Sequence, residues 1–192
     1  MKPFLQHLQV FQLQVALIAI TVAWPAIAMA QPKLEMHRVG AKADDGSGWH
    51  LAVSSKGSFS VLLPIPFNDF TTRDAATGEA TYVVGGKSSE GIKFVAVELA
   101  PGAKALPDLA SIPKTLAATA GNKVSDVKRS TKGDADVLTL TVSNASATLY
   151  MRCIQVNGVR YTLTTEFPNA YAELAAANKD KFFESFKLKT KS

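Results

Sequence analysis

The stretch KGSFSVLLPIPF, residues Lys56–Phe67, decides how the fold is built. Between Phe59 and Leu63, a phenylalanine, a valine and a leucine share one face of an alternating pattern, which is typical of a β-strand with one side in the core. Pro64 and Pro66 have no N–H to donate to a sheet, so the strand must end before them. The stretch therefore predicts a core strand over residues 59–63 with an abrupt end.

Working outward, further short runs of apolar and β-branched residues predict more strands. These runs are Trp49–Val53, Thr81–Val84, Ile92–Leu99, Val124–Arg129, Asp136–Val142, Leu149–Val156 and Val159–Phe167. The last two are joined by Asn157 and Gly158, which both tolerate a positive φ, so a tight hairpin is expected there. Residues 71–80 are polar and rich in turn formers, and Gly85–Ser88 is interpreted as part of a hairpin loop.

Two segments are predicted to be helices. The first is capped by Ser111, because Pro113 fits only in a first turn, and it ends at Gly121. The second is capped by Asn169 and carries a stripe at helical spacing. The stripe consists of Tyr171, Leu174, Ala175, Asn178, Phe182 and Phe186. Consecutive strands with hairpin links and two helices favour an α+β fold, in which the helices pack on an antiparallel sheet.

The first thirty residues have the pattern of an export signal. Lys2 precedes the apolar run Val15–Ala23, and Ala28 and Ala30 form the small-x-small pattern that signal peptidase recognises. The alternative is a membrane anchor, but the run is shorter than the roughly 20 apolar residues that a bilayer requires, and Pro25 interrupts it. We therefore expect a cleaved signal peptide over residues 1–30 and no membrane span after processing.

The chain that remains is long enough for one domain. Residues 31–47 are polar without clear periodicity and are interpreted as a flexible lead-in, so the domain is expected to span residues 48–192. The formal net charge is +5, and the lysines are too dispersed to favour a nucleic-acid partner. Cys153 is the only cysteine, so no internal disulfide can form, and we expect its thiol to be buried in a strand.

Few residues offer catalytic or metal-binding chemistry. A site can be drawn from His37, His50 and the turn residues Asp44 and Asp45, but their spacing matches no metal motif, and the two aspartates also suit a simple turn. No histidine follows Cys153, and no Gly-x-Ser-x-Gly elbow is present. No cofactor is therefore expected. Two further carboxylates, Asp134 and Asp136, would point the same way on one strand, where solvation is the simpler interpretation.

Three stretches carry a resemblance to a known family. GSFSVLLP (57–64), GVRYTLTTEFP (158–168) and KFFESFKL (181–188) are similar to the PsbP-like superfamily, which includes an extrinsic photosystem II protein and a Ran-binding import factor. One difference is that Ser58 separates a glycine and a phenylalanine that are usually adjacent in the family. The resemblance implies an α/β/α sandwich with a central antiparallel sheet of about six to seven strands and two main helices. It implies binding and assembly roles, and it assigns no functional residue.

Two functions remain open. The first is an exported, non-catalytic binding or assembly module of the bacterial periplasm, whose partner is an envelope protein or a small ligand. Its binding surface would lie in the loops expected at Asn68–Ala80 and Gly102–Pro107. The alternative is a small periplasmic hydrolase or metal-dependent enzyme that uses His37, His50 and the Asp44–Asp45 turn. Either protein would be periplasmic or secreted.

Export should remove residues 1–30, because the pattern at Ala28 and Ala30 directs cleavage before Gln31. The intact mass of protein recovered from the periplasm of an expressing bacterium should equal that of residues 31–192. A mature form that retains Val15–Ala23 would contradict the cleaved signal.

Overall fold

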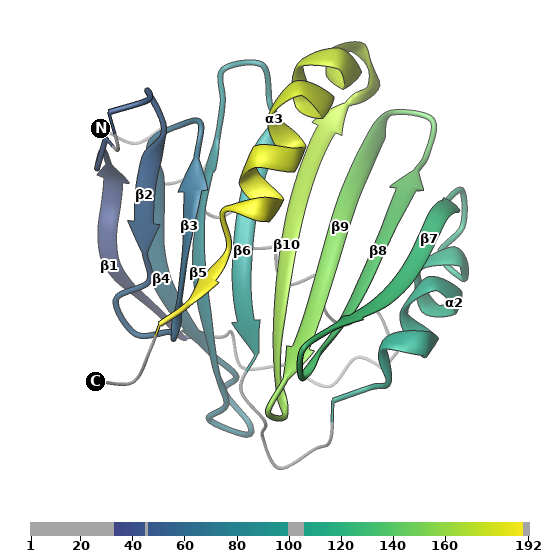
Figure 1. The fold of residues 1–192 in the computed structure, drawn as a ribbon, viewed down its shortest axis with the longest axis horizontal. Helices are drawn as coiled ribbons and strands as arrows, with labels where there is room; N and C mark the ends of the chain where they lie inside the picture. Colours follow the sequence, from purple (N-terminus) through teal and green to yellow (C-terminus); the bar gives the residue numbers. More distant parts are fainter. Residues whose placement is uncertain (1–32, 45, 100–105, 190–192) are drawn as a thin grey trace. The chain divides into compact units, whose positions relative to one another are not determined.

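Two antiparallel sheets form the fold (Figure 1). The main sheet has eight strands in the order β1-β4-β5-β6-β10-β9-β8-β7, and the small sheet has three in the order β11-β3-β2. The strands of the main sheet are β1 (Lys33–Ala41), β4 (Phe67–Arg73), β5 (Ala80–Lys87), β6 (Lys93–Leu99), β7 (Lys123–Lys132), β8 (Ala135–Ser143), β9 (Ala147–Val156) and β10 (Val159–Pro168). Those of the small sheet are β2 (His50–Val53), β3 (Phe59–Leu63) and β11 (Lys187–Leu188).

The computed structural model describes residues 33–44, 46–99 and 106–189, which belong to one compact unit running from Gln31 to Ser192. The expected signal peptide with Ala28 and Ala30 lies outside the described residues, as do Asp45 and residues 102–105.

Two α-helices and two short 3-10 turns complete the described fold. α3 (Ala172–Glu184) follows the turn η2 (Asn169–Tyr171), and α2 (Ile112–Ala117) follows the turn η1 (Leu109–Ser111). Figure 1 shows the small sheet and α3 in front of the same face of the main sheet, with α2 beside β7 at the far edge. Within the described ranges, no helix combines the length and the apolar character that a membrane span requires.

The expected α/β/α sandwich with six to seven strands and two main helices is therefore wrong. The described fold is mostly β, with eight strands in the main sheet and three more in a second sheet. Only α3 is a helix of more than three turns, because α2 has six residues. The second sheet replaces much of the expected helical cover: β2 and β3 take the place beside α3 that a helix would fill.

Polar sequence explains why two strands of the main sheet were missed. Residues 67–73 were expected to be mostly loop, yet they form β4, in which Asp69 and Thr71 are buried and hydrogen-bonded rather than solvated. The segment interpreted as a lead-in contains β1, which pairs with β4 along a register interrupted by irregularities. Partners distant in sequence satisfy these polar groups, so local composition did not reveal the strands.

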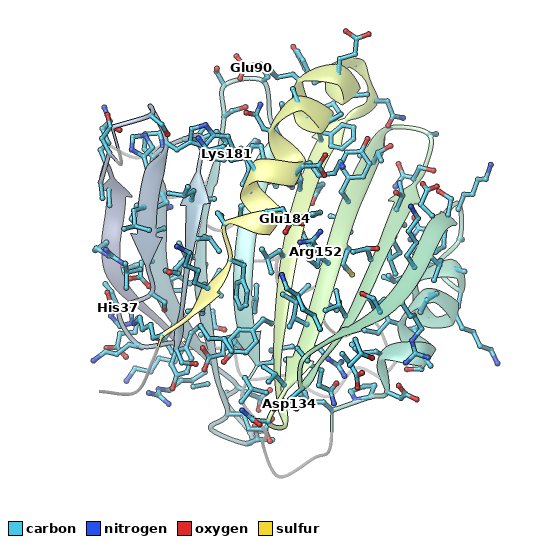
Figure 2. All side chains as sticks on the ribbon, viewed as in Figure 1. His37, Glu90, Asp134, Arg152, Lys181 and Glu184 are labelled. Atoms are coloured by element: carbon cyan, nitrogen blue, oxygen red, sulfur yellow. The ribbon has the colours of Figure 1, made fainter. Side chains whose placement is uncertain are left out.

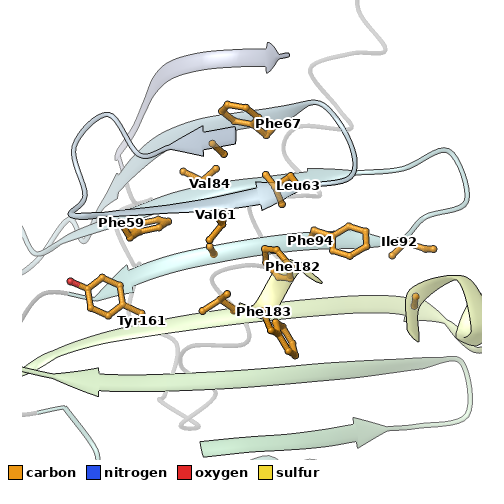
Figure 3. Close-up of a cluster of buried hydrophobic side chains, with 14 of the residues drawn as sticks. Phe59, Val61, Leu63, Phe67, Val84, Ile92, Phe94, Tyr161, Phe182 and Phe183 are labelled. Carbon is orange, nitrogen blue, oxygen red and sulfur yellow. The ribbon is translucent and has the colours of Figure 1, made fainter. Parts of the chain in front are cut away.

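The first core cluster lies between the main sheet and the layer formed by the small sheet and α3 (Figure 3). Its buried members are Ala52, Phe59, Val61, Leu63, Phe67, Val84, Ile92, Phe94, Ala96, Tyr161, Leu163, Phe167, Ala175, Phe182 and Phe183. The strand predicted over residues 59–63 has these bounds in the structure, and its alternating residues from Phe59 to Leu63 are fully buried. Aromatic pairs link the layers, with Phe59 and Tyr161 centred 6.1 Å apart and Phe94 and Phe182 5.6 Å apart.

A second core cluster lies at β8 and β9, where η1 and α2 contribute the packing residues. Its buried members are Leu109, Leu138, Leu140, Val142, Leu149, Met151 and Cys153. The expected burial of Cys153 is confirmed, since its side chain is 1% exposed, and this burial raises the pKa of the thiol. The hairpin at Asn157 and Gly158 is also confirmed, with φ values of 51° and 74°.

The buried face of α3 differs from the predicted stripe. Ala175, Phe182 and Phe183 are buried, whereas Tyr171 and Leu174 are exposed. The helix does not begin at Asn169: a 3-10 turn comes first, and the α-helix starts at Ala172. The stripe is therefore correct at Ala175 and Phe182 and fails at its start, where a 3-10 turn replaces the first turn of the predicted α-helix.

Gly85 and Gly86 belong to β5 rather than to a loop. A Cβ on Gly86 would lie 2.4 Å from the carbonyl oxygen of Pro66, and one on Gly85 would lie 2.7 Å from that of Phe94. The glycines therefore permit close approach of backbone segments, one of which is the proline-rich exit of β3.

Phe59→Ala should destabilise the mature protein by about 3–5 kcal/mol, because it empties a fully buried site between the two sheets. Denaturant unfolding followed by the fluorescence of Trp49 measures the change. Leu174→Ala is the matched control: it belonged to the predicted stripe but is 48% exposed, so it should cost less than about 1 kcal/mol. Equal losses in the two variants would contradict the burial of β3.

Candidate functional site

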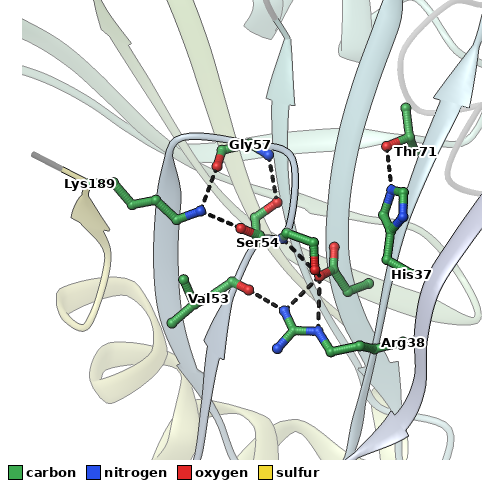
Figure 4. Close-up of polar contacts among 9 residues, drawn as sticks. His37, Arg38, Val53, Ser54, Gly57, Thr71 and Lys189 are labelled. Atoms are coloured by element: carbon green, nitrogen blue, oxygen red, sulfur yellow. Dashed lines mark hydrogen bonds and ion pairs between the residues drawn. The ribbon is translucent and has the colours of Figure 1, made fainter. Parts of the chain in front are cut away.

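The two histidines proposed for a metal or hydrolytic site make separate interactions. His37 of β1 places Nε2 2.8 Å from Oγ1 of Thr71, and Nδ1 lies 3.8 Å from a carboxylate oxygen of Glu35 (Figure 4). His50 begins β2, and its buried Nδ1 has no hydrogen-bond partner among the described residues.

Asp44 acts as a turn former. Its Oδ1 accepts hydrogen bonds from the backbone N–H groups of Gly46, at 2.8 Å, and Gly48, at 3.3 Å. In the described parts of the chain, no three His, Cys, Asp or Glu side chains are grouped so as to hold a metal ion. Asp44 and His50 are paired through an isolated β-bridge, but the two histidines and Asp44 do not form a group of three in the described residues.

A buried arginine lies behind the segment that leads to η1. Arg160 Nη2 donates to the carbonyl oxygen of Pro107 and, at 2.9 Å, to Oε1 of Gln155. Its buried Nε has no partner within the part of the chain that the structure describes. Burial lowers the pKa of this guanidinium. Arg160 thus attaches the segment before η1 to the main sheet.

An open hollow of about 300 Å³ lies beside this segment. It is lined by Leu109, Arg129, Ser130, Thr131, Asp136 and Val137. Asp136 accepts a hydrogen bond of 3.3 Å from the hydroxyl of Thr131, whereas Asp134 lies in the exposed turn before β8 (Figure 2). The two aspartates therefore do not share a strand, in agreement with the simpler interpretation that they are solvated.

A polar network surrounds residues 54–58, the loop that joins β2 to β3. At one end of this loop, Oδ2 of the buried Asp69 accepts hydrogen bonds from the N–H of Ser55 at 2.9 Å and from its hydroxyl at 2.6 Å. The same oxygen receives Nη2 of Arg38 at 2.6 Å and Nε at 3.1 Å. Arg38 also donates to the carbonyl oxygen of Val53, so β1 and β4 together hold this end of the loop (Figure 4).

Glu98 of β6 holds the other end of the loop. Its Oε2 accepts from the N–H of Ser58 at 2.6 Å and from the Ser58 hydroxyl at 3.0 Å, and that hydroxyl lies 2.8 Å from the phenol oxygen of Tyr161. Burial raises the pKa of Tyr161. A Cβ on Gly57 would lie 2.9 Å from the same carboxylate oxygen, so the loop requires a small residue there.

Lys189 closes this arrangement from the C-terminal side. Its Nζ donates to the carbonyl oxygens of Ser54 and, at 2.8 Å, Gly57, and its backbone N–H donates to Ser58 at 2.8 Å (Figure 4). We call Asp69, Glu98 and Lys189, with the loop they hold, the hairpin clamp. The clamp leaves Lys56 exposed at the tip of the loop.

The small sheet, which the clamp holds against the main sheet, has exposed apolar residues on its outer side. Leu51 pairs across strands with Leu62, and Val53 pairs with Ser60, which in turn pairs with Lys187. We call these five residues the outer strip. Leu51 is 44% and Val53 39% exposed. The alternation at 49–53 indicated that Leu51 and Val53 share a face, but it did not show that this face points to solvent.

Comparisons with known proteins identify no family: neither a protein-family model nor a curated protein matches the chain. One solved structure that is similar is LpqN of Mycobacterium tuberculosis, which is described as involved in cell envelope biogenesis. It is 13% identical, the match covers 83% of this chain and 85% of LpqN, and the TM-score is 0.39. At that score the two structures differ too much for any property of LpqN to be transferred.

Asp69→Ala should destabilise the protein by about 3 kcal/mol, because it leaves the N–H and hydroxyl of Ser55 without their buried acceptor and Arg38 without its counter-ion. Chemical unfolding measures the loss. Asp180→Ala is the control, since it removes an exposed ion pair with Lys179 and should cost less than about 1 kcal/mol. A loss in Asp69→Ala no larger than that of the control would contradict the role of the clamp.

Proposed function

We propose that this chain is an exported, non-catalytic binding or assembly module of the bacterial envelope, and that it binds through the outer strip. The observation that carries the proposal is the exposure of Leu51 and Val53 on a sheet whose loop is hydrogen-bonded to the carboxylates of Asp69 and Glu98. Single exposed apolar residues are common on protein surfaces. Here Leu51 and Val53 lie next to each other on one face of β2, and Leu51 is paired with another leucine, Leu62, on β3.

Rigidity supports a binding role for this surface. The loop of the outer hairpin is held at both ends by carboxylates of the main sheet, and Lys189 holds its carbonyl groups. A surface that is already ordered loses little conformational entropy when it binds, so even a small apolar area can contribute to affinity.

The hydrogen bonds made by His37 and Asp44 argue against the alternative that the protein is a hydrolase. His37 is hydrogen-bonded to Thr71, and Asp44 accepts two N–H groups of its own turn. Neither side chain is oriented by a partner toward a common reacting atom, which general acid–base chemistry requires.

The outer strip replaces the loops as the proposed binding surface. Of the expected loop Asn68–Ala80, residues 68–73 belong to β4, and the remaining turn is closed by Asp74, whose Oδ1 accepts from the N–H groups of Ala76 and Thr77. Residues 102–105 of the second loop lie outside the described residues.

We further propose membership of the PsbP-like superfamily, without the sandwich architecture that was expected from it. The three similar stretches form β3, β10 and the segment from the end of α3 into β11. Residues from all three pack in the first core cluster, where Phe59, Tyr161 and Phe186 contact one another. The residues that carry the resemblance therefore pack against one another in the core, which supports a common ancestry of this core with that of the superfamily.

The test compares the double variant Leu51→Ser/Val53→Ser with wild type after expression and fractionation of a bacterial host. The fraction of protein that co-purifies with the envelope should fall in the variant. Val127→Ser/Leu174→Ser is the control, because it removes two apolar residues of similar exposure elsewhere and should behave as wild type. Thermal unfolding checks that both variants are folded.

Undiminished envelope association of the outer-strip variant would contradict the proposed surface. Turnover of an ester, phosphate or peptide substrate that disappears in His37→Ala/His50→Ala would contradict the non-catalytic role.

A further inference from the structure

We propose that the outer strip docks on the surface of an anionic phospholipid bilayer. This inference rests on the proposed function, in that it uses the same surface, and it adds the chemistry of the partner. The additional observation is a group of lysines at one end of the strip, namely Lys56, Lys187 and Lys189, which we call the lysine end.

Hydrogen bonds and strand register place the three lysines together. Lys187 of β11 pairs with Ser60, which also pairs with Val53 of the outer strip. Lys189 binds the carbonyl oxygens of Ser54 and Gly57, and Lys56 lies between those two residues at the exposed tip of the loop. The lysine end therefore surrounds the loop and borders the exposed side chain of Val53.

The charge balance at this end is positive. Beneath the loop lie two carboxylates, Asp69 and Glu98, of which Asp69 is paired with Arg38. Counted with the three lysines, four cations stand against two carboxylates. Asp69 is 1% and Glu98 6% exposed, so their charges face the interior. Lys56 and Lys187 are exposed, so their charges face solvent, while the ammonium of Lys189 binds carbonyl oxygens of the loop.

Exposed leucine and valine bordered by lysine match the chemistry of an anionic membrane surface. Apolar side chains enter the boundary between headgroups and acyl chains, and lysines interact with the lipid phosphates. The central area of a protein–protein interface is instead typically depleted of lysine and enriched in aromatic residues. The outer strip contains a lysine and no aromatic residue, which favours the lipid surface over a protein partner.

The structure also predicts how strong this binding is. The exposed apolar area is small and the lysines are few, so binding should be reversible and should weaken with ionic strength, because salt screens charges at the surface. Each lysine that reaches an anionic surface increases the affinity about fivefold.

The experiment uses residues 31–192 and large unilamellar vesicles of phosphatidylcholine alone or with 30% phosphatidylglycerol, with bound protein measured by co-sedimentation. Binding is expected only with phosphatidylglycerol, and it should decrease at 0.5 M salt. Lys56→Gln/Lys187→Gln should lower the affinity by about 25-fold, because each lysine contributes about fivefold. Leu51→Ser/Val53→Ser leaves the lysine end unchanged and should also lower the affinity for these vesicles.

The matched control for charge is Lys128→Gln/Lys132→Gln on β7, at the opposite edge of the main sheet from β1. It removes the same charge and should bind as wild type. Equal losses in the two lysine variants would show attraction by net charge alone, and equal binding to both vesicles would exclude recognition of anionic lipid. Either result overturns the inference.

The failure of this inference is distinguishable from that of the proposed function. If the protein ignores both vesicles while Leu51→Ser/Val53→Ser still loses envelope association, the lipid is excluded and the outer strip binds another envelope component, such as a protein with an acidic surface. If neither experiment responds to that variant, the inference and the proposed surface both fail.

Discussion

Two carboxylates that the main sheet buries, Asp69 and Glu98, constrain the rest of the structure. An ionised carboxylate in the interior is costly unless hydrogen bonds and counter-charges satisfy it. The loop of residues 54–58 supplies N–H and hydroxyl groups to one oxygen of each, Oδ2 of Asp69 and Oε2 of Glu98, and Arg38 supplies a cation to Asp69. The small sheet is therefore held to the main sheet by polar anchors as well as by the apolar core.

These anchors determine what the protein shows to solvent. Once the loop is attached at both ends, β3 must direct Phe59, Val61 and Leu63 into the core, and β2 must do the same with Ala52. Because side chains alternate along a strand, Leu51 and Val53 then point outward, next to Lys187 of β11. The hairpin clamp and the outer strip thus belong to the same β-hairpin, which connects the stability of the fold to the proposed binding surface.

Strong local patterns led to correct predictions. The strand at residues 59–63, the hairpin at Asn157 and Gly158 and the burial of Cys153 all follow from alternation or turn chemistry within a few residues. The candidate site could not be predicted in the same way. Ser55 and Asp69 are 14 residues apart and Ser58 and Glu98 are 40 apart, so no local pattern indicates that they meet. The sequence indicated Asp44 and Asp45 instead, because they lie between His37 and His50.

The sequence by itself determined the periodicity of the strands, the abrupt end of β3 at its prolines and the tight turn before β10, since each depends on the geometry of a few consecutive residues. Only the tertiary structure decided that the polar segment Phe67–Arg73 is a strand and that the leucine and valine of β2 face solvent. Alternation defines two faces without saying which is buried, and that choice depends on hydrogen-bond partners from distant strands. Burial of Asp69 is favourable only where the loop and Arg38 reach it, and the fold alone brings them there.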